Sequence, residues 1–248
     1  MRRKELRTQV WGEVRFQKLM ATALGRRQPK ALVGCQEAAG RRLLTTYTAL
    51  AVRGEHLLQS LLAGQRPKQW LHYPKNDAID QVNGYQWFYH SHSPEDRAGA
   101  IEHGHFHLFA RRQLWARRLQ SKAEKGFADK TGNPSEHVNT RHLLTIGLDA
   151  KGVPISLLTV NSWVTGDLML SAANTEWLLA QMHLDTGHPE IDAVLESVIT
   201  LCADEIRQML TARDVALSAK PPRDVLDDRG LEVLSETTIE LDRKLAAI

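Results

Sequence analysis

The sequence predicts an α+β protein in which an antiparallel sheet carries a cluster of histidines and is flanked by N-terminal and C-terminal helices. Apolar residues recur at the helical period through residues 5–64 and again through residues 174–217. Between them, residues 70–167 change to aromatic and β-branched side chains that alternate with polar ones and are interrupted by glycine and proline. This order of helices, strands and helices is typical of the α+β class.

The N-terminal stretch, residues 5–64, predicts amphipathic helices. Leucines and valines keep the helical spacing up to Leu24, after which Gly25 can end a first helix. Pro29 can open a second helix at its first turn, where a missing N–H costs nothing. Gly54 weakens the pattern, so this second stretch is either one long helix or two shorter ones.

The central stretch, residues 70–167, predicts the sheet. Residues 85–92 and 103–110 are rich in aromatic side chains and alternate with histidines, which indicates two strands. The clearest hairpin joins residues 142–148 to residues 153–160 through the turn Asp149-Ala-Lys-Gly152, which supplies a glycine for left-handed backbone.

The remaining segments are predicted to be helical. A basic helix is expected over residues 113–125, and further helices over residues 174–217. Residues 218–248 begin with a proline-rich linker and predict a terminal helix that Ser235 would cap. We therefore expect residues 1–217 to form a single α+β domain, followed by a linker and a terminal helix.

The composition excludes several classes of protein. With 42% hydrophobic and 25% charged residues the chain matches ordinary globular domains, and a net charge of +3 is too small to indicate a nucleic-acid surface. The helix at Arg111–Arg118 is instead a candidate contact for a partner protein. No apolar run approaches the length of a signal sequence or membrane span, so no membrane association is expected. Cys35 and Cys202 lie outside any C-x-x-C pair, which favours free thiols and a cytoplasmic location.

The most informative segment is Gln86–Phe109, which contains five of the eleven histidines in the chain. At the average frequency of 11 in 248 residues, a stretch of this length would contain about one. Imidazole is the commonest metal ligand and also titrates near neutral pH. The cluster therefore indicates a metal site or an acid–base site, and we favour metal. Its five members are His90, His92, His103, His105 and His107.

The spacing of these histidines places them on common faces of two strands. Side chains two residues apart lie on one face of a strand and are separated by roughly 6.5–7 Å. His90 and His92 thus share one face of the first strand, and the other three share one face of the second. Our first-choice ligands are His90, His92 and His105, with His103 and His107 as substitutes or supporting groups. A slip of one residue in the register would undo this alignment.

The ligand set predicts one divalent transition metal: iron, zinc or copper. Three imidazoles with an open position suit catalytic zinc, and two histidines with a carboxylate suit iron(II). Copper also accepts several imidazoles. Glu102 is the nearest carboxylate, as a ligand or general base, although strict alternation points it away from His103.

Other side chains near the cluster are candidates for binding or catalysis. Arg97 could hold an anionic substrate, and Tyr89 could contribute a polar contact. Asp77 and Asp80 precede the first of these strands and are candidate hydrogen-bond partners for ligand imidazoles. We therefore assign Glu102, Arg97 and Tyr89 as candidate catalytic residues.

Parts of the cluster resemble known metal-binding motifs. The stretch Gly84–His92 resembles the first half of the cupin signature, a glycine followed by H-x-H on a strand. The glutamate of that signature comes too early here, at Glu95, and the second cupin motif is absent. His90-Ser-His92 also resembles the H-S-H of JAMM metallopeptidases, but without the downstream Ser-x-x-Asp of that family.

A broader resemblance is to an uncharacterised bacterial family, a domain of unknown function. It is carried by Trp70-Leu-His-Tyr-Pro74, by Gln86-Trp-Phe-Tyr-His-Ser-His92 and by Glu102-His-Gly-His-Phe-His-Leu-Phe109. The resemblance implies membership of a family and no particular activity.

The function predicted from these observations is that of a metal-dependent enzyme with a mononuclear, histidine-rich site that acts on a small molecule. A non-haem iron or copper oxidoreductase is favoured, because aromatic side chains crowd the segment and no serine or cysteine nucleophile motif occurs. The alternatives are a zinc hydrolase and a non-catalytic metal-binding or metal-sensing protein.

Overall fold

The computed structural model of the 248-residue chain describes residues 30–92, 102–131, 139–219 and 225–248. The chain divides into two compact units, Met1–Cys35 and Gln36–Ile248. The second unit contains the sheet and is described below; the helix expected before residue 25 lies outside the described residues.

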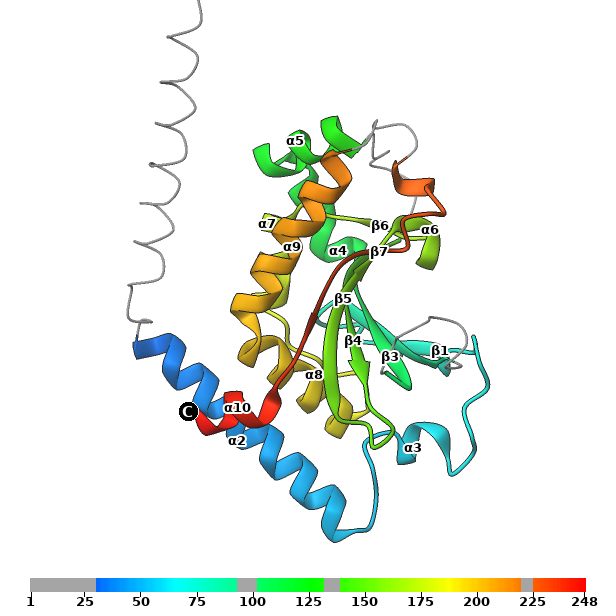
Figure 1. Cartoon of the computed structure of the whole chain (residues 1–248), viewed down its shortest axis with the longest axis vertical. Coiled ribbons are helices and arrows are strands. Elements are labelled where there is room, and N and C mark those ends of the chain that lie inside the picture. Colours follow the sequence, from blue (N-terminus) through cyan, green and yellow to red (C-terminus); the bar gives the residue numbers. More distant parts are fainter. Residues whose placement is uncertain (1–29, 93–101, 132–138, 220–224) are drawn as a thin grey trace, which may run out of the picture. The chain divides into compact units, whose positions relative to one another are not determined.

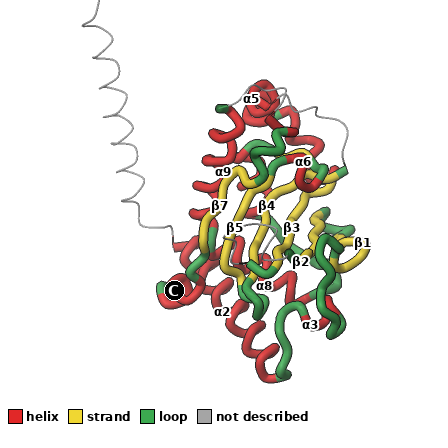
Figure 2. The backbone as a smooth tube through the Cα atoms, turned by 45° about the vertical axis from the view of Figure 1, so that its right-hand side comes forward, coloured by secondary structure: helices red, strands yellow, loops and turns green. Residues whose placement is uncertain are grey.

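A seven-stranded sheet forms the centre of the unit Gln36–Ile248 (Figure 2). Six strands lie side by side in the order β1-β2-β3-β4-β5-β7, and each neighbouring pair is antiparallel. The short strand β6 pairs in parallel with the beginning of β4. The strands are β1 (Tyr73–Ile79), β2 (Tyr85–Ser91), β3 (Gly104–Arg111), β4 (Thr140–Leu148), β5 (Pro154–Val160), β6 (Leu168–Met169) and β7 (Val233–Thr238).

The described helices include four that pack on one face of this sheet, α2, α7, α8 and α9 (Figure 1). Local sequence explains several of their ends: Ser171 caps α7 by accepting from the backbone N–H of Asn174, and Pro189 occupies the first turn of α8. The helical segments are α2 (Lys30–Val52), α3 (Gln59–Leu62), α4 (Arg112–Trp115), η1 (Ala116–Gln120), α5 (Lys122–Thr131), α6 (Ser162–Thr165), α7 (Ala172–Ala180), α8 (Pro189–Leu201), α9 (Ala203–Ser218), η2 (Val225–Asp227) and α10 (Leu241–Ala246).

The two faces of the sheet differ in chemistry because side chains alternate along each strand. On the helix-covered face, Trp87 of β2 is fully buried and packs against Phe106 of β3. The indole Nε1 of Trp87 donates to Asp192 Oδ1 of α8 at 2.9 Å, so the core has a fixed polar link to that helix. The opposite face of β2 and β3 presents Phe88 and the histidines. The main hydrophobic core thus lies on one side of these strands, and the histidines share the other side with the buried rings of Phe88 and Phe109.

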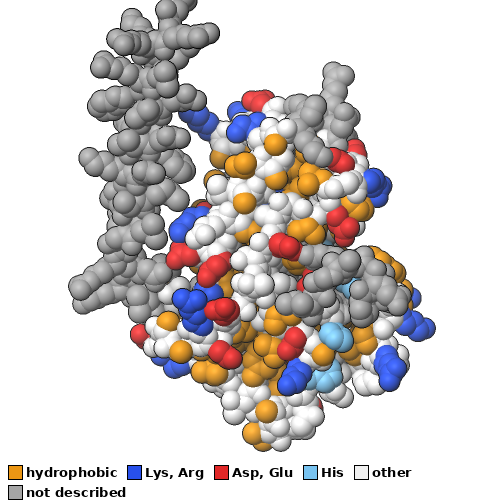
Figure 3. All heavy atoms as spheres, in the orientation of Figure 1, with side chains coloured by type: hydrophobic (Ala, Val, Ile, Leu, Met, Phe, Trp, Pro, Cys, Tyr) orange, Lys and Arg blue, Asp and Glu red, His pale blue; other side chains and the backbone are white. Residues whose placement is uncertain are grey.

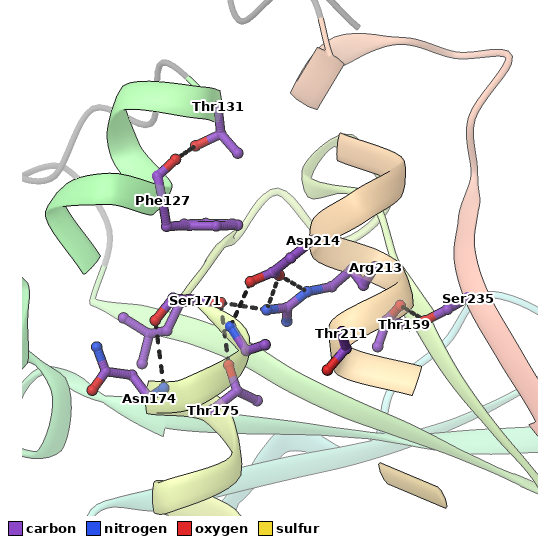
Figure 4. A network of polar contacts seen from close by, with 12 residues as sticks. Phe127, Thr131, Thr159, Ser171, Asn174, Thr175, Thr211, Arg213, Asp214 and Ser235 are labelled. Carbon is purple, nitrogen blue, oxygen red and sulfur yellow. Dashed lines mark hydrogen bonds and ion pairs between the residues drawn. The ribbon is translucent and has the colours of Figure 1, made fainter. Parts of the chain in front are cut away.

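A buried arginine ties α9 to the segment that leads into α7 (Figure 4). Arg213 donates from Nη2 to the carbonyl of Leu170 at 2.6 Å and to Asp214 Oδ1 at 2.7 Å. Asp214 in turn accepts from the backbone N–H of Ala172 at 2.8 Å. These bonds satisfy the charge of the Arg213 guanidinium, which would otherwise be costly to bury. They also hold this positive group near the beginning of β4, where its charge acts on His142.

The predicted fold class is confirmed: an antiparallel sheet carries a histidine cluster and is flanked by N-terminal and C-terminal helices. The hairpin is also confirmed, with Asp149 Oδ1 accepting from two backbone N–H groups of the turn and Gly152 at a φ of 77°. Of the two alternatives for the second N-terminal stretch, the structure has two helices, since α2 ends at Val52 and Gly54, before α3, has a φ of 68°.

Three elements differ from the prediction. The basic helix expected over residues 113–125 is divided into α4, η1 and the beginning of α5. The helical pattern after Pro189 breaks at Cys202 into α8 and α9. Residues 218–248, expected as a linker and a terminal helix, also contain β7. Ser235 lies in this strand and donates to the carbonyl of Met209, so it does not cap the terminal helix.

Candidate metal centre

Three histidine side chains converge at the ends of β2 and β3. The Nε2 atom of His105 lies 2.7 Å from Nε2 of His90 and 3.2 Å from Nε2 of His92. Among the described residues, these three form the group whose ligand atoms all lie within 4.8 Å of one another. His90 and His105 are buried and His92 is partly exposed.

The pairing of β2 with β3 produces this convergence. His90 stands directly opposite His105 in the antiparallel ladder, where facing side chains are nearest neighbours. Gly104 fixes this part of the ladder, because a Cβ there would collide with the carbonyl oxygen of His90 and the hydroxyl of Tyr89. A side chain at position 104 would therefore push the strands apart beside the histidines.

The nitrogen separations fit a shared ion. Ligand nitrogens about 2.0–2.1 Å from a tetrahedral zinc ion stand about 3.3–3.4 Å apart. The separation between His92 and His105 is already near that value, and that between His90 and His105 is shorter by roughly 0.6 Å. An outward rotation of His90 would bring its separation from His105 to that value.

The environment keeps the imidazole of His90 neutral, as metal binding requires. Burial, together with the neighbouring rings of His92 and His72, lowers the pKa of His90 to about 3. A neutral imidazole retains a lone pair on one nitrogen, which is the form that binds a metal.

A second polar layer lies deeper in the sheet, next to the converging group. Nε2 of His107 lies 3.2 Å from Nε2 of His90, and its Nδ1 lies 3.1 Å from both Nε2 of His142 and the hydroxyl of Thr145. The Thr145 hydroxyl is also 3.1 Å from His142 Nε2. A hydroxyl can donate to one nitrogen and accept from the other, so Thr145 can fix the ring orientation of both histidines.

His142 is a site residue that the sequence analysis missed. Burial, together with the charge of Arg213, lowers its pKa to about 3. Strict alternation would place His142 and Thr145 on opposite faces of β4, but the register shifts between Leu108 and Phe109 of β3, which pair with Leu144 and His142. The extra residue in β4 turns His142 to the histidine face. The sequence did contain a signal for this residue, since His142 is the first residue of the strand predicted over residues 142–148.

A stacked pair covers the outer side of the cluster. The imidazole of His72 stacks on the ring of Phe88 with centroids 3.6 Å apart, and its Nδ1 lies 3.0 Å from Asp77 Oδ1. Asp77 also accepts from Gln86, so this carboxylate orients His72 instead of a converging histidine. Asp80, the other expected partner, accepts from the backbone N–H groups of the turn that follows β1.

Trp70 lies over the converging histidines in a strained conformation. Its backbone φ is 64°, a left-handed value that is rare for a bulky residue. The indole meets His92 edge-on with centroids 5.1 Å apart and meets His90 at 6.1 Å, yet 60% of the residue is exposed. Such strain is found at functional sites, where the surrounding structure imposes it.

The other candidate residues lie in different places. His103 is exposed, Glu102 is partly exposed just before β3, and neither belongs to the converging group found among the described residues. Tyr89 belongs to the helix-covered core, where its ring packs near Phe106 and burial raises its pKa to about 12, and it also lines a cavity together with His92. Arg97 lies outside the described residues. Their catalytic roles stay predictions.

Trp70 should report the arrival of a metal ion by its fluorescence. Copper(II) quenches an excited indole at short range, and Trp70 is in ring contact with two converging histidines. Titrating copper(II) should remove roughly one sixth of the emission, the share of one tryptophan in six. Trp70→Phe should abolish most of this loss, while Trp177→Phe, which alters an exposed indole on α7, should not. Equal quenching in all three proteins would show that copper does not bind beside Trp70.

These features define an α+β protein with a buried polyhistidine group that has the geometry to hold a metal ion. The chain belongs to the family described as a domain of unknown function (DUF6969), which matches residues 37–239 and thus extends from α2 past the end of β7. The expectation of an uncharacterised family is confirmed. No curated protein and no solved structure shows significant similarity to the chain. None of the helices in the described residues combines the length and apolar character needed to cross a bilayer.

Proposed function

We propose that the protein is a metal-dependent enzyme whose mononuclear centre is held by His90, His92 and His105 and which acts on a small molecule. The observation that carries the proposal is the convergence of three Nε2 atoms from two paired strands. Three protein ligands leave a coordination position open, which is the usual arrangement of a catalytic site; structural zinc sites are closed by four.

A cavity beside the histidines favours catalysis over metal storage or sensing. Its volume is about 690 Å³ and its lining includes His92 and His103. Figure 3 shows histidine side chains reaching the surface on this side of the molecule. Cavities of this size are typical of sites for small molecules. A non-catalytic metal-binding protein, the alternative function, has no need of such a space next to a ligand.

The donor set favours zinc first and copper second. Imidazole suits both ions, and iron(II) enzymes of the facial-triad type need a carboxylate that the converging group of described residues does not contain. Zinc in such a site lowers the pKa of a bound water to about 7 and supplies a nucleophile for hydrolysis. Copper would support the oxidoreductase expected from the sequence. We therefore propose a zinc hydrolase as the leading case and a copper oxidoreductase as the second.

The free thiols agree with a cytoplasmic location, which we also propose. Neither Cys35 nor Cys202 forms a disulfide. Cys202 is buried, and burial raises its pKa to about 12, so it remains a protonated thiol. Paired cysteines would instead be expected in an oxidising compartment.

Metal content provides the direct test. Untagged protein expressed with zinc, copper and iron in equal supply should contain about one equivalent of a single ion by mass spectrometry. The double variant His90→Ala/His105→Ala should contain less than about a tenth of an equivalent, because two of three ligands are gone. His183→Ala is the matched control, since its side chain is 73% exposed and lies on Glu196, away from the centre.

The result that overturns the proposal is a wild-type protein with less than about a tenth of an equivalent of every transition metal.

In a protein that does bind metal, the open coordination position is tested with cobalt(II) in place of the native ion. Azide should change the visible spectrum of the cobalt protein; an unchanged spectrum would favour a closed, non-catalytic site.

A further inference from the structure

The cavity beside the converging histidines is lined by several segments of the chain. It lies between the segment Leu58–Gln69, the end of β2 and the turn between β4 and β5. His92 belongs both to its lining and to the converging group, so a molecule in the cavity is in contact with a proposed metal ligand. The cavity is therefore where a substrate of the proposed centre would sit.

The charged groups of this lining favour an anion. Among the described residues, the lining contains one arginine, Arg66, and one carboxylate, Asp149. Asp149 is already engaged, because its Oδ1 accepts from the backbone N–H groups of Lys151 and Val153, each at 2.8 Å. The guanidinium of Arg66 has a planar fork of donors that matches a carboxylate.

The neutral groups of the lining favour a polar organic molecule. Gln59, Gln65 and Gln69 each contribute an amide, and His56 and His103 contribute imidazoles. Amides both donate and accept hydrogen bonds, and each imidazole provides an N–H donor. Leu58, Leu62 and Pro67 add apolar surface for a carbon skeleton.

We propose that this cavity binds the substrate as a small organic carboxylate, with Arg66 and His103 holding the carboxylate group while the rest of the molecule extends toward His92. This inference deepens the proposed metalloenzyme function and rests on it, because the bound carboxylate is a substrate only if the protein is that enzyme. It also assigns Arg66 the anchoring role that the sequence analysis gave to Arg97.

Matched probes of different charge test the inference. Succinate, its neutral diamide succinamide and the diamine 1,4-diaminobutane have similar carbon skeletons and carry negative, no and positive charge. Isothermal titration of the full-length protein should show succinate binding at least about tenfold more tightly than succinamide, with no binding of the diamine. Arg66→Gln should weaken succinate binding about tenfold and leave succinamide unchanged.

Arg207→Gln is the matched control, because Arg207 is an exposed arginine of α9 that pairs with Asp204 and does not line the cavity. Its succinate affinity should equal that of the wild type. The inference is overturned if succinate does not bind, if succinamide or the diamine binds as well, or if Arg66→Gln has no effect.

Metal content measured on the same samples separates this result from the proposed function. Arg66→Gln should retain the metal of the wild type, because Arg66 is not in the converging group. Metal without selective binding of succinate would remove the cavity inference and leave the metal centre. Selective binding without metal would leave a carboxylate-binding protein and remove the enzyme.

Discussion

Removing the bound metal with a chelator should lower the Tm of the wild-type protein by about 8–16 °C. An ion present at roughly a thousand times its Kd stabilises the folded state by about 4 kcal/mol. In a chain of this size each kcal/mol corresponds to about 2–4 °C in Tm. The bound ion would also link neighbouring strands, because His90 and His105 stand opposite each other in β2 and β3. Differential scanning calorimetry with and without a chelator measures the shift.

The double variant His90→Ala/His105→Ala is expected to have the same Tm with and without chelator, whatever its own stability. His183→Ala should respond like the wild type, since its side chain lies away from the centre. A wild-type shift below about 2 °C, with metal loss verified by mass spectrometry, would contradict tight binding of an ion by the folded protein.

The strands that bear the histidines could be predicted because the signal there is local. Aromatic side chains alternate with histidines at a period of two, and one face of the sheet must be apolar to meet the helices. Trp87 and Phe106 accordingly occupy the helix-covered face, and His90 and His105 the other. The same alternation gave the first-choice ligands, and the structure brings all three together.

Long-range pairing explains what the sequence did not reveal. β7 joins the sheet beside β5, although more than 70 residues separate Val160 from Val233. Its segment, Val-Leu-Ser-Glu-Thr-Thr, is short and mostly polar, and only its partner strand defines it as an edge strand. A linker and helix were therefore the local interpretation of residues 218–248.

A single irregularity of the ladder hid His142. The shift between Leu108 and Phe109 changes which residues of β4 share a face, and alternation alone cannot reveal a bulge. The position of Trp70 over the histidines could not be predicted either, since its left-handed backbone and its contact with His92 depend on the folded loop. The histidine face is consequently larger than the segment Gln86–Phe109.

Thr145→Val should weaken metal binding by about 10–100-fold while leaving the three converging histidines in place. Thr145 is fully buried, and its hydroxyl contacts His107 Nδ1 and His142 Nε2, both at 3.1 Å. Valine has nearly the same shape and removes only these polar contacts. His107 would then lose the group that orients its ring, and that ring borders the position of the ion, because its Nε2 lies 3.2 Å from the ligand atom of His90. A competition titration against a chelating dye measures the affinity.

Thr159→Val is the matched control for this measurement. Thr159 is also a buried threonine of the sheet, and its hydroxyl pairs with that of Ser235 at 2.7 Å, on β5 and β7. Both substitutions remove a buried hydrogen bond and should reduce stability by a similar amount, about 1 kcal/mol. Only Thr145 contacts the histidine layer, so only its loss should change the metal affinity. Equal affinities in the two variants would show that the metal centre ends at His90, His92 and His105 and that the layer of His107 and His142 serves folding alone.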